Sequence, residues 1–390
     1  MNRPDVSLIA PYPALDGNHH AGTSGVASYT ANLARALRDD GADVHVVAPF
    51  HDDAPTERVV EHDGAGIRVE RCFERRAGGL RAARGAVLGA GARVAHLQFE
   101  LFLYGGPSAL AGVLPTLTGL RRRGTAAVVT LHQTVDPSTV DRDYTALHRV
   151  PVPPSVARVA IGSLQRAIAG TASAVVVHEQ PFAEVVGDAT VVPHGIEDVA
   201  PLDRRAARAQ LGLDDRLVAL CFGFVAPYKG LETALVAARQ AGPEVQCVVA
   251  GGEHPRLAAA GDAYARILAE THPEARFTGW VPGDDVAAWF HAADVALFPY
   301  PRPFSSSGAL ALALASRTPV LLSAPMARCI GAPSAVVAPT VDTLAARLRT
   351  LAADPTEREA LQRWTDALAD GRRWDAVARR HLDVYQAVSP

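Results

Sequence analysis

Short apolar segments alternate with amphipathic helical segments along almost the whole chain, and this alternation limits the folds that it can adopt. The apolar segments VSLIAPY (6–12) and DVHVVAP (43–49) flank residues 25–41, whose apolar positions recur at helical spacing. Further strands of the same kind are expected at 93–100, 126–133, 173–179 and 190–195. Strands that alternate with helices pair in parallel, and the helices cover the sheet. The first half therefore predicts an α/β domain with a parallel sheet.

A second cycle of the same pattern begins near Asp203. Strands are expected at 216–224, 245–252, 275–281, 295–300 and 319–323, with helices between them. The sequence thus predicts two doubly wound Rossmann-like domains, at 1–198 and 199–370, joined within 195–205 and followed by a helical tail. In this architecture ligands bind at the carboxyl ends of the strands. We expect the site in a cleft between the two domains.

Composition excludes several classes of protein. The 390 residues are 48% hydrophobic and 20% charged, with a net charge of −3, so a general attraction to nucleic acid is not expected. The four cysteines are far apart and predict free thiols in a reducing compartment. The apolar run at the N-terminus is too short for a signal peptide, and no stretch has the length of a membrane span. We expect a cytoplasmic protein with at most peripheral membrane contact.

Two features of the second half predict an anion site. Lys229 and Gly230 follow a strand that ends near Gly223, and they open a helix. The segment Ser305-Ser306-Ser307-Gly308 precedes an alanine-rich helix expected at 309–316. A helix start carries unpaired N–H groups and a partial positive charge, and a lysine beside it suits a diphosphate.

The first half carries weaker signals. A glycine-containing turn, Gly22-Thr23-Ser24-Gly25, follows the first strand, but it matches neither a dinucleotide-binding motif nor a Walker motif. Such a turn lets the backbone approach a ligand, or it is simply a flexible connection. Histidines recur at the ends of predicted strands, and two acids lie just past such strands. We expect all of them near the cleft: His96, His132, His178, His194, Glu100 and Asp136. Their spacing does not predict a zinc site.

The motifs stand in a familiar order: T-L-H at 130–132, V-P-H-G-I at 192–196, G-F-V-A-P-Y-K-G-L-E at 223–232, F-T-G-W-V-P at 277–282, A-A-D-V-A-L-F-P-Y at 292–300, then S-S-G and T-P-V. The chain resembles the retaining GT-B glycosyltransferases of family four, which use nucleotide-diphosphate sugars. The resemblance covers essentially the whole chain and is more specific in the second half. It implies a hexosyltransferase of the GT-B fold that needs no cofactor or metal.

The resemblance also implies roles for particular residues. His132 and Lys229 would be catalytic. The donor, linked to UDP, GDP or dTDP, would contact Gly223, Lys229, Arg302, Ser305, Ser306, Ser307, Gly308 and Ala309. The acceptor, a small molecule, a lipid-linked group or a saccharide, would contact Gly22, Thr23, Ser24, Gly25, Glu100 and Asp136. The helix at 371–390 would return to the first domain.

The chain departs from the family pattern at three positions. Phe304 and Leu312 stand where many members carry a glutamate pair, and Phe224 stands where an arginine is usual. Arg302 is the cation that we expect to compensate. These departures leave open two alternatives: an epimerase of the same fold that uses His194 or Glu197, and a sugar-nucleotide-binding protein without catalysis. The D-x-D tripeptide at 141–143 favours a metal, but it lies in the other domain from the lysine.

Overall fold

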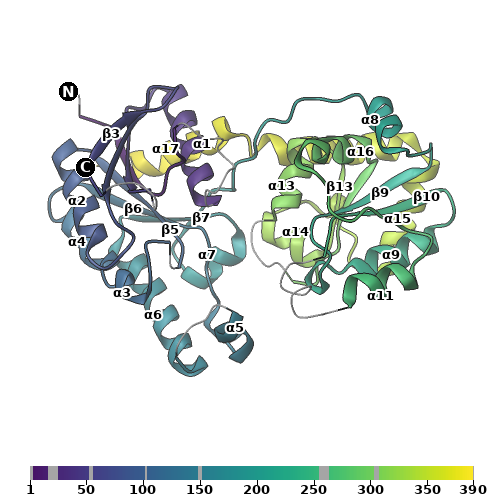
Figure 1. Cartoon of the computed structure of the whole chain (residues 1–390), viewed down its shortest axis with the longest axis horizontal. Helices are drawn as coiled ribbons and strands as arrows, with labels where there is room; N and C mark the ends of the chain where they lie inside the picture. The colour runs from purple at the N-terminus through teal and green to yellow at the C-terminus, as the bar shows by residue number, and fades with distance from the viewer. Residues whose placement is uncertain are drawn as a thin grey trace. The chain divides into compact units, whose positions relative to one another are not determined.

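The structure is a computed structural model that describes residues 3–15, 25–51, 56–101, 103–147, 152–253, 263–302 and 307–389. It contains two compact units (Figure 1). We call them the N-terminal unit, Met1–Gly195 with Trp374–Pro390, and the C-terminal unit, Ile196–Arg373. Gly22, Thr23, Ser24, Phe304, Ser305 and Ser306 lie outside the described residues.

One sheet of eight strands forms the centre of the N-terminal unit, in the order β3-β4-β2-β1-β5-β6-β7-β8. The strands are β1 (Val6–Ile9), β2 (Val44–Pro49), β3 (Val59–His62), β4 (Arg68–Phe73), β5 (Val94–Phe99), β6 (Ala126–Leu131), β7 (Ala174–Val177) and β8 (Thr190–Val191). All neighbours pair in parallel except β3 with β4. The order changes direction between β1 and β5, which is where such a sheet places a ligand crevice.

Helices cover both faces of this sheet because alternate strand residues point to opposite sides. Leu8, Val46 and Val128 pack under α1 (Gly25–Asp39) and α17 (Trp374–Val388), which lie together (Figure 1). Ile9 and Val129 face the other layer. That layer contains α2 (Gly79–Ala90), α4 (Val113–Arg121), α6 (Pro154–Thr171) and α7 (Gln180–Val186). The unit also has three short helices: α3 (Pro107–Leu110), η1 (Pro137–Thr139) and α5 (Arg142–Leu147).

The C-terminal unit contains a parallel five-stranded sheet in the order β11-β10-β9-β12-β13. Its strands are β9 (Leu217–Phe222), β10 (Val245–Ala250), β11 (Arg276–Phe277), β12 (Val295–Phe298) and β13 (Val320–Leu322). Its helices are α8 (Arg204–Leu211), η2 (Pro227–Lys229), α9 (Leu231–Ala241), α11 (Tyr264–Thr271), η3 (Gly283–Asp285), α12 (Val286–Ala292), α13 (Gly308–Ala315), α14 (Ala324–Ile330), η4 (Ser334–Val336), α15 (Val341–Ala353) and α16 (Pro355–Asp370). The predicted fold of two doubly wound Rossmann-like domains is confirmed.

Two details differ from the expectation. No strand was expected at 59–73, where the structure has the antiparallel pair β3 and β4, and β4 carries charged residues. Glu70 and Arg71 are nevertheless buried, and each has ionic partners: Glu70 contacts Arg58 and Arg68, and Arg71 contacts Glu61. His96 was expected at a strand end, but it lies inside β5 and is fully buried.

Candidate functional site

The sheet of the C-terminal unit also has a topological switch point, between β9 and β12. From β9 the chain moves outwards to β10 and β11, and β12 then pairs on the other side of β9. In doubly wound sheets a ligand binds at the carboxyl ends of the two strands at this point. Lys229 follows β9 and Tyr300 follows β12, so both lie at this end of the sheet.

Lys229 is the only lysine among the 38 lysine and arginine residues of the chain. Its side chain is buried, at 6% exposure, and its Nζ donates to the carbonyl oxygen of Phe222 at 2.6 Å. Nζ also lies 5.8 Å from the ring centroid of Tyr300, a cation–π distance. Burial lowers the pKa of Lys229 to about 8. Within the described residues, no carboxylate forms an ion pair with this ammonium group.

Two glycines near this lysine have no room for a side chain. Gly223 has φ +94°, and a Cβ atom there would lie 2.6 Å from Lys229 Nζ. Gly230 has φ +62°, and a Cβ atom there would lie 2.3 Å from the carbonyl oxygen of Pro299. A larger residue is therefore excluded at both positions, by backbone conformation and by space. The predicted helix start is confirmed, with Gly230 as the residue before α9.

The second half of the anion site is the start of α13. Ser307 is the N-cap, and its Oγ accepts from the N–H of Leu310 at 3.3 Å and lies 3.3 Å from Tyr300 Oη. Gly308, the first residue of the helix, is exposed, and a Cβ atom there would meet nothing within 4 Å. Ala309 is half-buried, and Arg302 is exposed in the preceding loop. Lys229, Tyr300 and Ser307 are thus connected by contacts at one end of one sheet.

Tyr300 was not predicted as a site residue. It is buried, its ring contacts the Lys229 ammonium and its hydroxyl contacts the cap of α13. Its carbonyl oxygen accepts from Ser323 Oγ at 2.6 Å, which fixes the backbone between β12 and α13. The motif P-Y after a strand was visible in the sequence. Its contact with Lys229 depends on the pairing of β12 with β9, which the local sequence does not show.

His132 lies in the N-terminal unit, directly after β6. Its Nε2 lies 2.8 Å from Gln98 Oε1, and its Nδ1 lies 3.1 Å from Nε2 of His178. The ring of Tyr29 packs against it with centroids 4.8 Å apart, and against His178 and His194 at 5.1 and 5.0 Å. Burial is the largest cause that holds the pKa of His132 well below its usual value, followed by the neighbouring histidines. Three of the four predicted histidines therefore form one cluster around Tyr29.

The predicted acceptor residues have different surroundings. Glu100 follows β5 at the switch point of its sheet, and burial raises the pKa of its carboxyl group. Asp136 is exposed and caps the short helix η1, where its Oδ1 accepts from the N–H of Ser138 at 2.8 Å. Gly25 is the exposed first residue of α1, and a Cβ atom there would meet nothing. The strand order places Glu100, which follows β5, and Gly25, which opens the helix after β1, at the switch point of the sheet.

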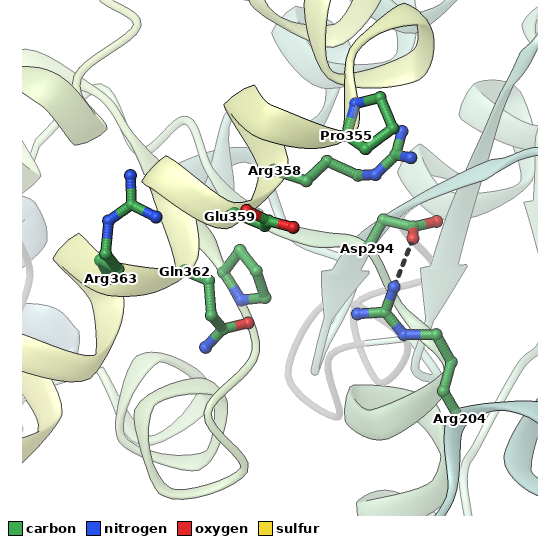
Figure 2. Close-up of a pocket in the computed structure, with 8 residues that line it drawn as sticks. Arg204, Asp294, Pro355, Arg358, Glu359, Gln362 and Arg363 are labelled. Atoms are coloured by element: carbon green, nitrogen blue, oxygen red, sulfur yellow. Dashed lines mark hydrogen bonds and ion pairs between the residues drawn. The ribbon is translucent and has the colours of Figure 1, made fainter.

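A surface pocket of about 460 Å³ lies at the opposite, amino end of the C-terminal sheet (Figure 2). Asp294 precedes β12 there, and its carboxylate accepts from Arg204 and Arg208 and from the N–H of Val218. Figure 2 shows the Arg204–Asp294 pair on one side of the pocket and Glu359 on the helix across it. The carboxylate of Asp294 is thus occupied by protein groups, and the pocket lies at the other end of the sheet from Lys229 and Ser307.

The structure describes the D-x-D tripeptide in part. Asp141 caps α5, where its Oδ1 accepts from the N–H of Tyr144 at 2.8 Å, and the side chain of Asp143 lies outside the described residues. Across the described ranges, no group of three or more His, Cys, Asp or Glu side chains is placed to hold a metal ion. None of the described helices is long and apolar enough to cross a membrane.

Two family models match the chain: Glycosyltransferase Family 4 over residues 23–198 and Glycosyl transferases group 1 over residues 216–354. The chain belongs to the GT-B glycosyltransferases of family four. It is therefore an enzyme that transfers a sugar. The N-terminal match contains His132 and the C-terminal match contains Lys229, Tyr300 and Ser307, so the two families divide the chain as its sheets do.

Solved glycosyltransferases share the fold of this enzyme over its whole length. Sucrose-phosphate synthase from Thermosynechococcus elongatus has a TM-score of 0.66 at 20% identity, covering 99% of each chain. HepE of Anabaena in complex with UDP-glucose has a TM-score of 0.62 at 15% identity, covering 98% of this chain and 99% of its own. AviGT4, a glycosyltransferase of avilamycin A biosynthesis, has a TM-score of 0.55 at 18% identity, covering 99% of this chain and 98% of its own. Comparison with curated proteins gives no match.

Proposed function

We propose that this glycosyltransferase takes its sugar from a nucleotide-diphosphate donor bound by the C-terminal unit at Lys229 and the start of α13. The observation that carries the proposal is the buried ammonium group of Lys229, which has a carbonyl oxygen and an aromatic ring as its neighbours. A buried cation without a carboxylate partner is unfavourable unless a ligand supplies the negative charge. A diphosphate supplies that charge.

The start of α13 provides the second group of donors. The N–H groups in the first turn of a helix are free of helical partners and carry partial positive charge. Ser307 Oγ accepts a hydrogen bond from the N–H group of Leu310. The open surface at Gly308 leaves room for a phosphate or sugar oxygen. HepE, which has the same fold, has been solved with UDP-glucose, and this supports a nucleotide sugar as the donor class. Ser305, Ser306, Arg302 and Ala309 complete the proposed donor site.

We further propose that transfer retains the anomeric configuration and needs no divalent metal. Retention is supported by membership of family four. In the front-face mechanism proposed for this class, the bond from the anomeric carbon to the diphosphate oxygen breaks as the bond to the acceptor oxygen forms. The acceptor proton passes to the departing phosphate oxygen. Lys229 and α13 stabilise the charge on the leaving group, which is the role that a metal has in other classes.

The N-terminal unit is proposed to bind the acceptor near Glu100 and the turn at 22–25, with Asp136 at the periphery. His132 is proposed to contact the transferred sugar. A small molecule, a lipid-linked group and a saccharide are the acceptor classes to test.

A panel of nucleotide sugars tests the proposal. UDP-glucose, GDP-mannose and dTDP-glucose are each screened by thermal unfolding, because a ligand that binds the folded state raises its stability. The stabilising donor is then incubated with acceptors in the presence of EDTA, and the product anomer is read by NMR. We expect nucleoside diphosphate release that depends on the acceptor, persists in EDTA and gives a product with the anomeric configuration of the donor. An inverted product, or activity that EDTA abolishes and magnesium restores, contradicts the corresponding part of the proposal.

A further inference from the structure

A chain of hydrogen bonds in the N-terminal unit determines where the protons of its central histidines lie. His178 is 4% exposed, and its Nδ1 lies 3.0 Å from the carbonyl oxygen of Val192. A carbonyl oxygen only accepts, so Nδ1 of His178 carries the hydrogen. Burial lowers the pKa of His178 to about 3, so the ring is neutral at pH 7 and its Nε2 bears a lone pair.

The same reasoning extends to His132. Nε2 of His178 lies 3.1 Å from Nδ1 of His132 and accepts, so Nδ1 of His132 is the donor. The ring of His132 is also neutral, because burial and the adjacent histidines hold its pKa well below the usual value. Its Nε2 therefore bears a lone pair and is an acceptor.

This result determines the orientation of Gln98. The atom 2.8 Å from Nε2 of His132 is placed as the amide oxygen, but two acceptors do not form a hydrogen bond. The two ends of an amide have nearly the same shape, and their orientation follows from the hydrogen bonds that they form. The amide nitrogen of Gln98 thus faces His132, and the amide oxygen faces the ring of His96, whose two nitrogens lie 3.3 and 3.5 Å from that end of the amide. Because Gln98 is fully buried and His132 is half-buried, a ligand reaches this chain of hydrogen bonds at His132.

We propose that His178 is a positioning residue that fixes His132 in the Nδ1–H tautomer, so that its Nε2 accepts a hydrogen bond from a hydroxyl group of the transferred sugar in place of the Gln98 amide. The proposal rests on the proposed function for the identity of that hydroxyl group. The direction of the hydrogen bonds from Val192 to His132 rests on the contacts of the two rings and on their neutral state, and not on the identity of the ligand. Tyr29 packs against both rings, but its hydroxyl group lies 3.4 Å from Nε2 of His381 and is not part of this chain.

Two substitutions separate positioning from a merely structural role. His178→Gln keeps an acceptor near the position of Nε2 and loses the bond to Val192. His178→Asn keeps a donor near Nδ1 for Val192 and loses the acceptor for His132. If His178 only supports the fold, His178→Asn should be closer to wild type in the tautomer of His132 and in sugar binding. If His178 positions His132, His178→Gln should be the closer of the two.

Long-range ¹H–¹⁵N NMR of histidine rings at pH 7.5 reads the tautomer of His132 directly, with its signals assigned by their loss in His132→Gln. We expect a protonated Nδ1 and an unprotonated Nε2 in wild type and in His178→Gln, and a shift towards the Nε2–H form in His178→Asn. An Nε2–H tautomer or an imidazolium of His132 in wild type overturns the proposal, even if neither His178 variant folds. This result does not depend on whether the donor assignment is correct.

Binding supplies the functional readout. UDP-glucose and UDP differ by the sugar alone, so the ratio of their affinities isolates the contacts of the sugar. We expect His178→Asn to lower the affinity for UDP-glucose about three- to tenfold, which is the effect of one hydrogen bond, and to leave the affinity for UDP unchanged. In His178→Gln the ratio of the two affinities should return to that of wild type. The corresponding GDP-mannose and GDP pair is used if the panel selects a guanosine donor. An equal loss for nucleotide and nucleotide sugar shows that His178 acts on the fold and contradicts the positioning role.

Discussion

At the scale of the residue, Lys229 combines high burial with a positive charge that no carboxylate of the described residues neutralises. Desolvation lowers its pKa from 10.5 to about 8. Below pH 8 the lysine is protonated in both the folded and the unfolded protein, and the folded state carries the full cost of burying the charge. As pH rises from 8 to 10.5 the folded protein loses this proton before the unfolded chain does, so stability increases over that window. The residue is retained at a cost to stability, as expected of a ligand-binding group.

Lys229→Met tests this assignment. At pH 7 we expect the unliganded variant to be no less stable than wild type, with a gain of roughly 1–3 kcal/mol that vanishes above pH 10.5. Turnover should fall at least about a hundredfold, which corresponds to roughly 2.7 kcal/mol of lost charge stabilisation in the transition state. Thermal unfolding at pH 7 and pH 11 and initial rates are the measurements. A variant that turns over normally excludes Lys229 from the site.

At the scale of the element, the short helix α13 begins at an exposed residue and is held in the core by three buried side chains. Leu310, Ala313 and Leu314 pack into the core of the C-terminal unit, whereas Gly308 faces open space. The helix is thus held firmly while its first turn is left accessible. This arrangement suits an element whose backbone N–H groups contact a ligand.

Gly308→Val separates ligand approach from folding. The backbone of Gly308 is not in the left-handed region and its Cβ position is free, so we expect a change in stability within about 1 kcal/mol. The affinity for the donor should fall at least about tenfold, because the side chain occupies the approach to the first turn. Calorimetric titration with the donor measures this. Gly85→Val is the matched control, since Gly85 is also exposed in a helix with an open Cβ position but lies on α2; equal losses of affinity in both variants would refute the role of α13.

Much of the architecture could be predicted, because the strands, helices and turns follow from local patterns of apolar, glycine and proline residues. The helix expected at 309–316 is found at Gly308–Ala315, and the strand expected at 216–224 is found at Leu217–Phe222. The hairpin β3–β4 could not be predicted, because the ionic partners of the buried Glu70 and Arg71, which are Arg58 and Glu61, reach them only once β3 and β4 pair. The same holds for the site: the position of Lys229 is visible in a strand–turn–helix segment, whereas its contact with Tyr300 exists only once β9 and β12 pair.

At the scale of the whole molecule, the two units differ in how their buried titratable groups respond to acid. In the N-terminal unit, burial lowers the pKa values of His178 to about 3 and of His45 and His381 to about 4. A histidine whose pKa is lower in the folded state loses stability as pH falls below its unfolded value near 6.5, because the unfolded chain binds protons that the folded state does not. Lys229 in the C-terminal unit is fully protonated throughout this range.

We therefore expect acid to destabilise the N-terminal unit selectively. Below pH 6.5 each such histidine contributes up to about 1.4 kcal/mol of lost stability per pH unit, until its folded pKa is reached. Hydrogen exchange followed by mass spectrometry at pH 7.5 and pH 5.5, corrected for intrinsic exchange rates, measures the loss of stability separately in each unit. Protection in β5, β6 and α17 should fall more than protection in β9, β10 and α9. An equal fall in both units would show that the buried histidines do not control acid stability.

The central claim, that a nucleotide-diphosphate sugar binds beside Lys229, can be tested on a single atom because the chain has one lysine. Protein labelled with [¹³Cε]lysine should give one side-chain resonance, and its chemical shift followed against pH reports the pKa of Lys229. We predict a pKa near 8 in the free enzyme. When the stabilising nucleotide sugar of the panel is bound, the pKa should rise by at least about one unit, because the diphosphate favours the charged form. A resonance that titrates at the ordinary value of about 10.4, or that does not change when a donor demonstrably binds, would contradict the account.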